Sequence, residues 1–397
     1  MSRYHSYINT AVALLDTYKG EQPFAIFIKN YYAQHKKYGS KDRKQITTLC
    51  YNYFRIGFAA KDSSVERKIL IANFLCSCES NDLLENFHPE WNGQANLPLD
   101  KKLELLKDEF DINRIFPFKK QLSEVVNSES YGRSMLVQPS LFLRIRPQCR
   151  VTTLKKLSAA TLDYKLLPAD CVELPPATNA DAFFIIDKEV VVQDINSQQV
   201  LNYLFLNERS LLKPIGKVIS VWDCCAASGG KSLLAYDMLK GKLDITVSDI
   251  RLSIIQNLHQ RFKRADLKIY KYFIEDSGDK IKKSAALSYQ LIICDAPCTG
   301  SGTWGRTPEQ LCYFKPALLK DYSDRQKRIV SNVATHLLKD GIFVYITCSV
   351  FKEENEIIAD FIVAELGLTL LHQEILAGFD VKGDTMFVAI FKKIISG

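Results

Sequence analysis

The stretch VISVWDCCAASGGKSLLAYDML, at residues 218–239, decides the fold. It begins with an apolar, β-prone run, continues through small residues, and ends with apolar residues at helical spacing. A strand that turns through small residues into a helix is the first unit of a doubly wound α/β domain. Because such a turn lets backbone N–H groups approach a ligand, we expect the ligand site of the chain near it.

The alternation of strand-like and helix-like segments continues to the end of the chain. The strand-like runs are LDITVSD, LKIYKYF, YQLIICD, IFVYITC and TMFVAIFKK. This rhythm predicts a Rossmann-like domain with a mostly parallel sheet over residues 206–397. Ligands bind at the carboxyl ends of strands in such sheets. Candidate residues at or just after these ends are Asp223, Asp249, Asp295 and Cys348.

Two segments with other patterns precede this domain. Residues 1–130 carry apolar residues at helical spacing, as in NTAVALLDTY and DRKQITTLCYNYFRIGF, and predict an all-α domain. Residues 131–205 predict a small α/β subdomain, in which SLFLRIR, AFFIID and EVVVQD are strand-like. TTLKKLSAATL is the helix-like run of this subdomain, and a Pro-containing loop follows it.

The composition excludes some classes of protein. With 397 residues, of which 47% are hydrophobic and 24% charged, the chain is long enough for two or three folded domains. It has neither an apolar run of about 18 residues nor a secretory signal, so we expect a cytoplasmic protein without membrane association. Eleven cysteines, an odd number in a large chain, predict reduced thiols. A net charge of +7 permits a polyanionic partner without requiring one.

The glycine-rich turn DCCAASGGKS, at residues 223–232, is ambiguous by itself. Gly230, Lys231 and Ser232 match the end of a phosphate-binding P-loop, but that motif needs a glycine where Cys225 stands. The G-x-G-x-x-G of dinucleotide-binding folds is missing. Taken alone, the turn fits a ligand-free connection equally well.

Two acids further along suit a nucleoside. Asp249 ends the second strand of the domain, where a carboxylate can accept hydrogen bonds from both hydroxyls of a ribose. Asp276 follows the third strand and could face an adenine. The alternative for both is a helix cap or a solvated loop acid.

Two cysteines follow neighbouring predicted strands, Cys298 in DAPCTGSG and Cys348 in YITCS. Carbon 5 of cytosine is a poor nucleophile, and a thiolate that adds to carbon 6 makes it reactive toward a sulfonium methyl group. The carbon 5 proton must then leave so that the thiolate can be expelled. Such a site needs a reactive cysteine, an acid and a second assisting group, which Cys348, Asp295 and Cys298 could supply. On spacing alone either thiol could attack, and either could be a buried hydrophobe.

A zinc site is the remaining use for cysteines in this region. It would combine Cys294 and Cys298 with Cys224 and Cys225, but the second pair is adjacent rather than spaced for tetrahedral ligation. We therefore expect no metal.

Three segments, DCCAASGGKS, DAPCTGSGTWGRTPE and YITCSVFKEENE, resemble the motifs of the RsmB/NOP2/Sun family of RNA 5-methylcytosine methyltransferases. The resemblance covers roughly the last 260 residues. It implies that Cys348 attacks the base, that Cys298 helps release the product, that Asp295 contacts the cytosine and that Lys231 reaches the reacting centre. It also implies S-adenosylmethionine as methyl donor, surrounded by Cys225, Ala226, Ala227, Ser228, Gly229, Gly230, Lys231, Asp249, Asp276 and Asp295.

Three positions depart from the family pattern. Ser228 stands where proline is usual, which we expect to loosen the turn; Gly305 replaces an arginine, and Glu189 replaces a glycine. The N-terminal part resembles the NusB-like RNA-binding domain of the bacterial RsmB branch through SKDRKQITTLCYNYFR, at residues 40–55. Its cations could bind RNA phosphates or could form a solvated face.

The resemblance implies a monomer that acts on RNA, with ribosomal RNA as the expected substrate and transfer RNA as the alternative. A second hypothesis is an inactive RNA-binding or assembly factor that keeps the fold. A third is a DNA cytosine methyltransferase, which would use a Pro-Cys after the fourth strand without a Thr-Cys-Ser after the fifth. The presence of both Cys298 and Cys348 favours the RNA enzyme.

Overall fold

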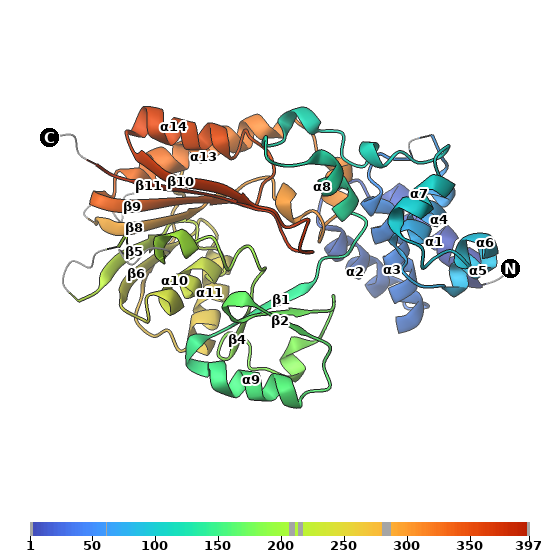
Figure 1. Cartoon of the computed structure of the whole chain (residues 1–397), viewed down its shortest axis with the longest axis horizontal. Helices are drawn as coiled ribbons and strands as arrows, with labels where there is room; N and C mark the ends of the chain where they lie inside the picture. Colours follow the sequence, from blue (N-terminus) through green and yellow to red (C-terminus); the bar gives the residue numbers. More distant parts are fainter. Residues whose placement is uncertain (1–2, 61, 206–210, 213–216, 280–286, 395–397) are drawn as a thin grey trace. The chain divides into compact units, whose positions relative to one another are not determined.

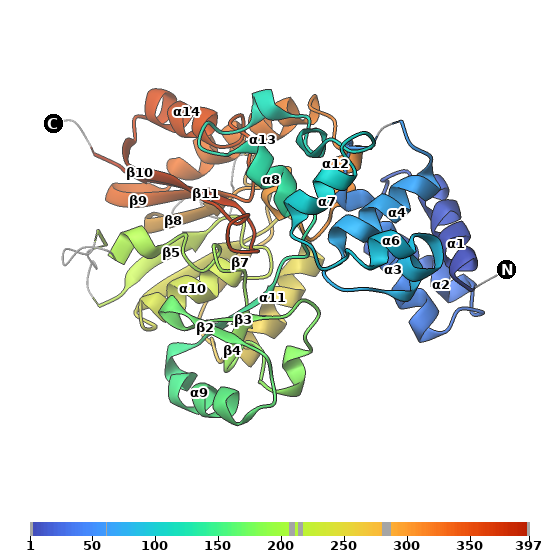
Figure 2. The same cartoon turned by 45° about the vertical axis from the view of Figure 1, so that its right-hand side comes forward.

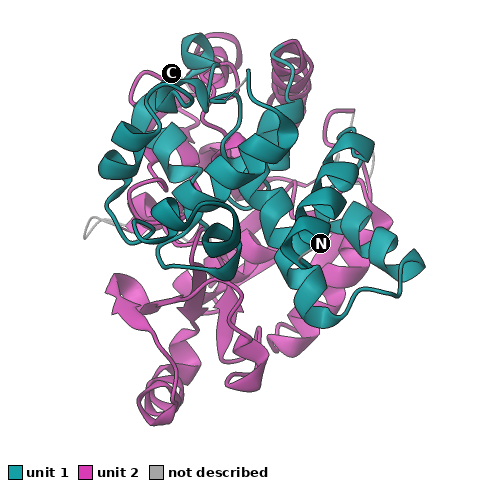
Figure 3. Cartoon of the chain, turned by 90° about the vertical axis from the view of Figure 1, so that its right-hand side faces the viewer, with its two compact units in different colours: residues 1–122, 126–138, 303–316 teal, residues 123–125, 139–302, 317–397 magenta. Residues whose placement is uncertain are grey.

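The computed structural model describes residues 3–60, 62–205, 211–212, 217–279 and 287–394. The chain forms two compact units (Figure 3). Unit 1 comprises residues 1–122, 126–138 and 303–316, and unit 2 comprises residues 123–125, 139–302 and 317–397. Residues 303–316 therefore leave the segment that the sequence assigned to the α/β domain.

Aromatic packing explains why this segment belongs to unit 1. Trp304 is buried, and its ring lies 6.4 Å from that of Phe116. Helix α12 (Glu309–Tyr313) places the Tyr313 hydroxyl 2.8 Å from the Tyr18 carbonyl oxygen, to which it donates. The segment is too short for its pattern of apolar residues to show that it packs against residues more than 180 positions away in the sequence.

The main body of unit 1 is helical, as predicted. Its helices are α1 (Arg3–Thr17), α2 (Phe24–Gln34), α3 (Ser40–Arg55), α4 (Val65–Cys76), α5 (Asp82–Phe87), α6 (Pro89–Asn92), α7 (Leu99–Leu105) and α8 (Ser128–Ser134). Helix α1 buries Ile8, Ala11 and Leu15, which lie three or four residues apart on one face. The side chain of Ser64 caps α4 by accepting a hydrogen bond from the Arg67 N–H group.

Unit 2 is built on a seven-stranded sheet with the order β10-β11-β9-β8-β5-β6-β7. Its strands are β5 (Ile219–Asp223), β6 (Leu243–Ser248), β7 (Lys271–Phe273), β8 (Tyr289–Asp295), β9 (Leu337–Thr347), β10 (Thr369–Leu376) and β11 (Met386–Lys392). Strands β5 to β9 pair in parallel, which confirms the predicted Rossmann-like architecture.

Helices cover both faces of this sheet, as Figures 1 and 2 show. Helices α10 (Gly230–Met238) and α11 (Leu252–Arg264) pack on one face, in a core cluster with Val221 of β5. Helices α13 (Leu318–Ala334) and α14 (Glu356–Leu366) pack on the other face, with Trp222. Neighbouring residues of β5 thus face two apolar layers, which is why the predicted strands are continuous apolar runs.

The sequence prediction missed one strand of this sheet. The missed strand is β10, which pairs antiparallel with β11 at the edge of the sheet, and β11 in turn runs antiparallel to β9 within the mostly parallel sheet. Strand β10 is mostly exposed or half-buried, so its sequence lacks the apolar run of a central strand. Strand β7 spans three residues of the predicted LKIYKYF.

A second sheet of unit 2 has the order β2-β3-β1-β4 and is antiparallel. It contains β1 (Leu141–Ile145), β2 (Lys165–Leu167), β3 (Cys171–Leu174) and β4 (Val190–Val192), with α9 (Arg150–Ala159). The predicted strand AFFIID is instead a short 3₁₀ turn and a loop, whose Phe184 is buried in the core of this sheet. Strands β2 and β3 lie in the expected Pro-containing loop, where Ala169 and Asp170 turn the chain with positive φ angles of 58° and 59°.

No helix in the described part of the chain is long and apolar enough to cross a lipid bilayer.

Candidate active site

The glycine-rich turn between β5 and α10 is pressed against α11. Gly229 has a φ of 83°, and a Cβ atom there would lie 2.6 Å from a ring carbon of Phe262. Ala227 also has a positive φ, of 45°. The sequence needs glycine at 229 both for the left-handed backbone and for the close approach of Phe262.

A pocket of about 390 Å³ opens at the carboxyl ends of β5, β6, β8 and β9. Seven residues singled out by the sequence line it, namely Cys225, Ala227, Asp249, Asp276, Asp295, Cys298 and Cys348. Five others do not: Ala226 is buried, Gly229 faces Phe262, and Ser228, Gly230 and Lys231 are also absent from the lining. The predicted residues thus gather around one cavity, although only part of the glycine-rich turn faces it.

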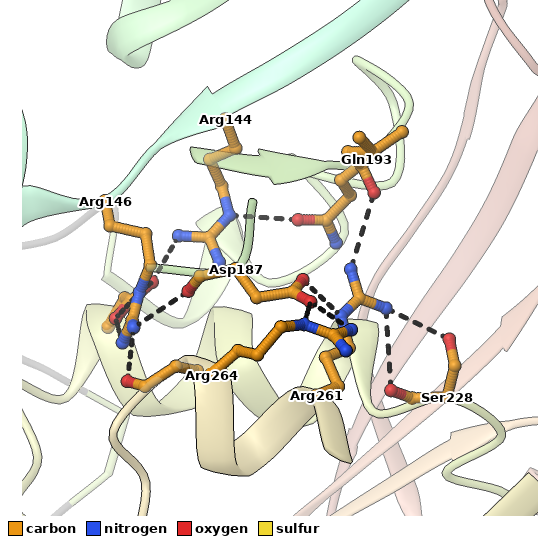
Figure 4. A network of polar contacts seen from close by, with 10 residues as sticks. Arg144, Arg146, Asp187, Gln193, Ser228, Arg261 and Arg264 are labelled. Carbon is orange, nitrogen blue, oxygen red and sulfur yellow. Dashed lines mark hydrogen bonds and ion pairs between the residues drawn. The ribbon is translucent and has the colours of Figure 1, made fainter. Parts of the chain in front are cut away.

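Ser228 is held by a charged residue of the neighbouring helix α11. Arg261 of α11 donates from Nη1 to the Ser228 hydroxyl at 3.0 Å and to its carbonyl oxygen at 3.5 Å (Figure 4). The same guanidinium donates from Nε to Asp187 at 2.8 Å. The expectation that Ser228 loosens the turn stays a prediction, and in the structure a charged side chain from the neighbouring helix holds this residue.

Asp249 has protein partners that the sequence did not reveal. Arg251 donates to its carboxylate from the backbone N–H at 2.9 Å and from the guanidinium at 3.0 and 3.2 Å. The N–H of Ala227 donates to the same carboxylate at 3.2 Å. Burial alone would raise the pKa of Asp249, but these hydrogen bonds hold the pKa below its ordinary value. Asp249 therefore stays ionised and ties β6 to the glycine-rich turn.

Lys231 and Asp295 form an ion pair at 2.8 Å, although they come from α10 and β8. Burial favours the neutral amine, but the charges of Asp295 and of Cys348 raise the pKa of Lys231 above its ordinary value. Lys231 therefore keeps a positive charge at the end of β8, paired with Asp295.

Cys298 and Cys348 face each other with their sulfur atoms 3.3 Å apart. A hydrogen bond to Cys348 and burial raise the pKa of the Cys298 thiol well above its ordinary value. Cys298 thus keeps its proton and can donate it to Cys348. The register of β8 and β9 brings the two residues together, since Asp295 pairs with Ile346.

Glu354 connects the two cysteine loops, a role that the sequence gave no reason to expect. Its buried carboxylate accepts hydrogen bonds from the N–H of Thr299 at 2.8 Å and from the hydroxyls of Thr299 and Ser349 at 2.6 and 2.5 Å. The amide of Gln326 in α13 donates to it at 3.2 Å. Thr299 follows Cys298 and Ser349 follows Cys348, so Glu354 fixes the residues next to both thiols.

Three further cysteines cluster at the start of the glycine-rich turn. The sulfur atoms of Cys224, Cys225 and Cys294 all lie within 4.8 Å of one another. Thiol hydrogen bonds from Cys224 and Cys294 lower the pKa of Cys225 to about 5. Sequence spacing argued against a metal group of cysteines, but neighbouring strands β5 and β8 bring Cys224 and Cys294 together. Cys298, the fourth member considered, lies with Cys348 instead.

The family model described as 16S rRNA methyltransferase RsmB/F matches residues 210–382. Over these residues the chain is similar to the RsmB/F methyltransferase family. The matched residues contain the pocket, the ion pair and both cysteine loops described above.

Curated relatives agree with this assignment. The probable ribosomal RNA small subunit methyltransferase B of Bacillus subtilis is 28% identical over 240 residues, which cover 59% of this chain and 52% of that protein. The ribosomal RNA small subunit methyltransferase F of Serratia proteamaculans is 22% identical over 43% of this chain and 37% of its own length. The matched stretches thus span about half or less of these relatives.

Solved structures extend the likeness in fold to both units. The crystal structure of PH0851 superposes with a TM-score of 0.68 at 19% identity, and covers 96% of this chain and 97% of its own. A methyltransferase homolog protein from Pyrococcus horikoshii gives a TM-score of 0.56 at 19% identity, over 67% of this chain and 90% of its own.

Proposed function

We propose that the protein transfers a methyl group from S-adenosylmethionine to carbon 5 of a cytosine in RNA, with Cys348 as the nucleophile. The observation that carries this proposal is the pair of thiols 3.3 Å apart at the wall of the pocket. A single buried cysteine has many explanations, but two facing thiols beside a fixed lysine suit a reaction with one attacking and one assisting thiol.

The pocket suits the methyl donor in size and in lining. Its volume of about 390 Å³ is in the range of small-molecule sites. We assign Asp249 to the ribose hydroxyls, Asp276 and Ile250 to the adenine, and the glycine-rich turn to the amino acid part. When bound, the donor supplies an electrophilic methyl group. Asp249 is ionised, as a carboxylate that accepts from hydroxyl groups needs to be.

Cys348 and its neighbours perform the chemistry on the base. The Cys348 thiolate adds to carbon 6, which makes carbon 5 nucleophilic toward the methyl group. Lys231 stabilises the thiolate, and Asp295, ion-paired to Lys231 at 2.8 Å, contacts the base. After methylation a water molecule takes the carbon 5 proton, the electrons of that C–H bond re-form the double bond between carbons 5 and 6, and the bond between Cys348 and carbon 6 breaks to release the thiolate.

The raised pKa of Cys298 supports this division of labour. A thiol that keeps its proton is a poor nucleophile, whereas it can donate a hydrogen bond to Cys348 before attack and exchange a proton during release. We therefore assign the attack to Cys348 and assistance in product release to Cys298.

We propose ribosomal RNA as the substrate class, because the relatives named above are ribosomal RNA methyltransferases. The target cytosine must be unpaired or flipped out to reach Cys348. In unit 1, which we propose to be a NusB-like RNA-binding domain, exposed Lys36, Lys37, Lys41 and Lys44 suit phosphate contacts. A monomer that works in the cytoplasm completes the proposal.

Methyl transfer to RNA tests this function. We would incubate the full chain with labelled S-adenosylmethionine and small-subunit ribosomal RNA that lacks 5-methylcytosine, and identify the modified nucleoside by mass spectrometry. Wild type should form 5-methylcytosine and Cys348→Ala should form none. Cys171→Ala, which removes a buried thiol of the small sheet, should behave as wild type.

Two outcomes would separate the alternatives. Methylation of transfer RNA but not of ribosomal RNA or ribosomal subunits would change the substrate class and keep the chemistry. Donor binding or RNA binding without any transfer would favour the inactive assembly factor.

A further inference from the structure

Two cysteines at the start of the glycine-rich turn and one on β8 form a sulfur-only cluster. Cys224 and Cys294 are almost completely buried, and Cys225 is half-buried. Their sulfur atoms come from the loop after β5 and from β8, and all lie within 4.8 Å of one another. Among the described residues, no fourth cysteine, histidine or carboxylate joins the cluster.

The spacing of these sulfur atoms suits a shared cation. Thiolates bound at about 2.3 Å to one zinc ion in tetrahedral geometry lie roughly 3.8 Å apart, and three thiolates in a plane around one ion at that distance lie roughly 4.0 Å apart. The three sulfur atoms of the cluster lie within 4.8 Å of one another, so the three side chains can converge on one ion.

The cluster is also reachable. Cys224 and Cys225 line the pocket, so a small ion can arrive from the pocket side while Cys294 closes the cluster from β8. The fold supports the cluster through the hydrogen bond from the Cys224 N–H to the Ile293 carbonyl oxygen at 3.0 Å, which sets β8 beside the loop. The ligand positions thus rest on strand ends rather than on a separate loop.

We propose that Cys224, Cys225 and Cys294 bind one thiophilic d¹⁰ cation, Zn²⁺ or Cu⁺, at the inner wall of the pocket. Sulfur ligands without nitrogen or oxygen partners select soft cations over Mg²⁺ or Ca²⁺. Cu⁺ is satisfied by three thiolates, whereas Zn²⁺ takes a fourth ligand, which the pocket supplies as water. Protons held by the thiols are released on binding.

A bound cation would also affect the methyl donor. This part of the proposal, unlike the metal site itself, rests on the proposed function. Cys225 begins the glycine-rich turn that we assign to the methyl donor. A cation held by Cys225 changes the wall of the donor site, so metal and donor exclude each other. The cluster would then make methyl transfer sensitive to free soft metals.

The test uses Cd²⁺ as a probe, because thiolate-to-cadmium charge transfer absorbs in the ultraviolet. The full chain carries Cys298→Ala and Cys348→Ala, so that the facing pair cannot bind the probe. One Cd²⁺ per chain should bind with the absorption of three thiolates. A further Cys294→Ser or Cys294→Ala should weaken binding at least about tenfold. Competition with Zn²⁺ and Cu⁺ then identifies the preferred cation.

Cys171→Ser in the same parent chain is the matched control, since Cys171 is a buried thiol outside the cluster, and it should change nothing. Equal thermal unfolding of Cys294→Ala and its parent without metal shows that the fold is intact. Absence of the charge-transfer band, or a band that survives both Cys294 variants, overturns the metal site.

Donor binding by the same parent chain, measured by dialysis, separates the two proposals. A rise of at least about tenfold in the apparent Kd of Cd²⁺ with saturating S-adenosylmethionine supports mutual exclusion. Unchanged Cd²⁺ affinity with bound donor overturns the exclusion. If the metal-free chain does not bind the donor at all, the proposed function is contradicted. The metal site is then still tested by the Cys294 variants alone.

Discussion

Asp223 and Asp249 end or follow neighbouring strands, yet their surroundings drive their pKa values apart. Complete burial raises the pKa of Asp223 to about 7, although one carboxylate oxygen accepts a hydrogen bond from Ser232 at 2.6 Å, which lowers it; the other oxygen has no partner. Asp249 receives several N–H groups, and its pKa is lowered. The pattern of the sequence treats both as strand-end acids, and only their contacts distinguish them.

Replacement of Asp223 by asparagine should change how stability depends on pH. The carboxyl group loses its proton near its ordinary pKa of 3.8 in the unfolded chain and near a pKa of about 7 in the folded protein. Between these values the folded state binds more protons, so the unfolding free energy of wild type falls as pH rises through this window. Asp223→Asn should lack this fall, which is at most about 4 kcal/mol. Urea unfolding at several pH values checks it, and a constant difference between the two proteins would contradict it.

Glu354→Gln should destabilise the cysteine loops. The glutamine amide cannot accept all the hydrogen bonds that Thr299, Ser349 and Gln326 donate, so we expect a loss of about 2–4 kcal/mol in unfolding free energy and a fall in kcat. Glu353→Gln is the control, because the Glu353 Oε2 atom is buried without a partner and should lose nothing. Similar unfolding midpoints for the two variants would show that Glu354 does not stabilise the two cysteine loops.

At the scale of elements, α11 is the support of the glycine-rich turn. Phe262 packs under Gly229, and Arg261 joins Ser228 to Asp187, which precedes β4 of the small sheet (Figure 4). The small sheet is also tied to α10 by Arg146, which donates to Asp237 at 2.7 Å. Helix α11 therefore holds the turn in two ways, by the packing of Phe262 and by the charged bridge from Arg261 to the second sheet.

Arg261→Ala should affect the methyl donor more than the chemical step. Loss of the hydrogen bonds to Ser228 frees the turn, and we expect the KM for S-adenosylmethionine to rise about tenfold while kcat stays within about twofold. Arg264→Ala is the matched control, because Arg264 donates to the same Asp187 at 2.7 Å but does not hold Ser228. Equal effects of the two variants on KM would mean that the turn needs only the ion pair.

The sequence predicts the features that depend on a local pattern of residues and misses those that depend on contacts between distant residues. Central strands such as β8 are continuous apolar runs because both faces are buried, so pattern alone located them and the cysteines at their ends. The edge strand β10 and the hairpin of β2 and β3 lack that burial and were missed. Arg251, Arg261 and Glu354 act through contacts that no local pattern records, and their roles needed the three-dimensional structure.

For the whole molecule, the assignment of residues 303–316 to unit 1 means that a cut between residues 138 and 139 does not separate the two units cleanly. These residues leave unit 2 between β8 and α13 and bury Trp304 and Leu311 within unit 1. Unit 1 is therefore not a simple N-terminal extension, since its core includes a segment from the second half of the chain.

A fragment of residues 139–397 should be unstable as a consequence. It retains Trp304, Leu311 and Phe314 but lacks the rest of unit 1, including Phe116 and Phe118, whose rings contact Trp304 and Phe314. We expect this fragment to aggregate at concentrations at which the full chain stays dispersed. Light scattering measures this, and Trp304→Ser with Phe314→Ser should improve its behaviour. A fragment that unfolds as cooperatively as the full chain would show that unit 2 needs nothing from unit 1.

The most direct test of the central claim is to trap the covalent complex between protein and RNA. Wild type, Cys298→Ala and Cys348→Ala are incubated with S-adenosylmethionine and unmethylated ribosomal RNA, and a denaturing gel reports the adduct. We expect an adduct that accumulates with Cys298→Ala, because release is impaired, and none with Cys348→Ala. An adduct that forms with Cys348→Ala and is absent from Cys298→Ala would contradict the assignment and make Cys298 the nucleophile.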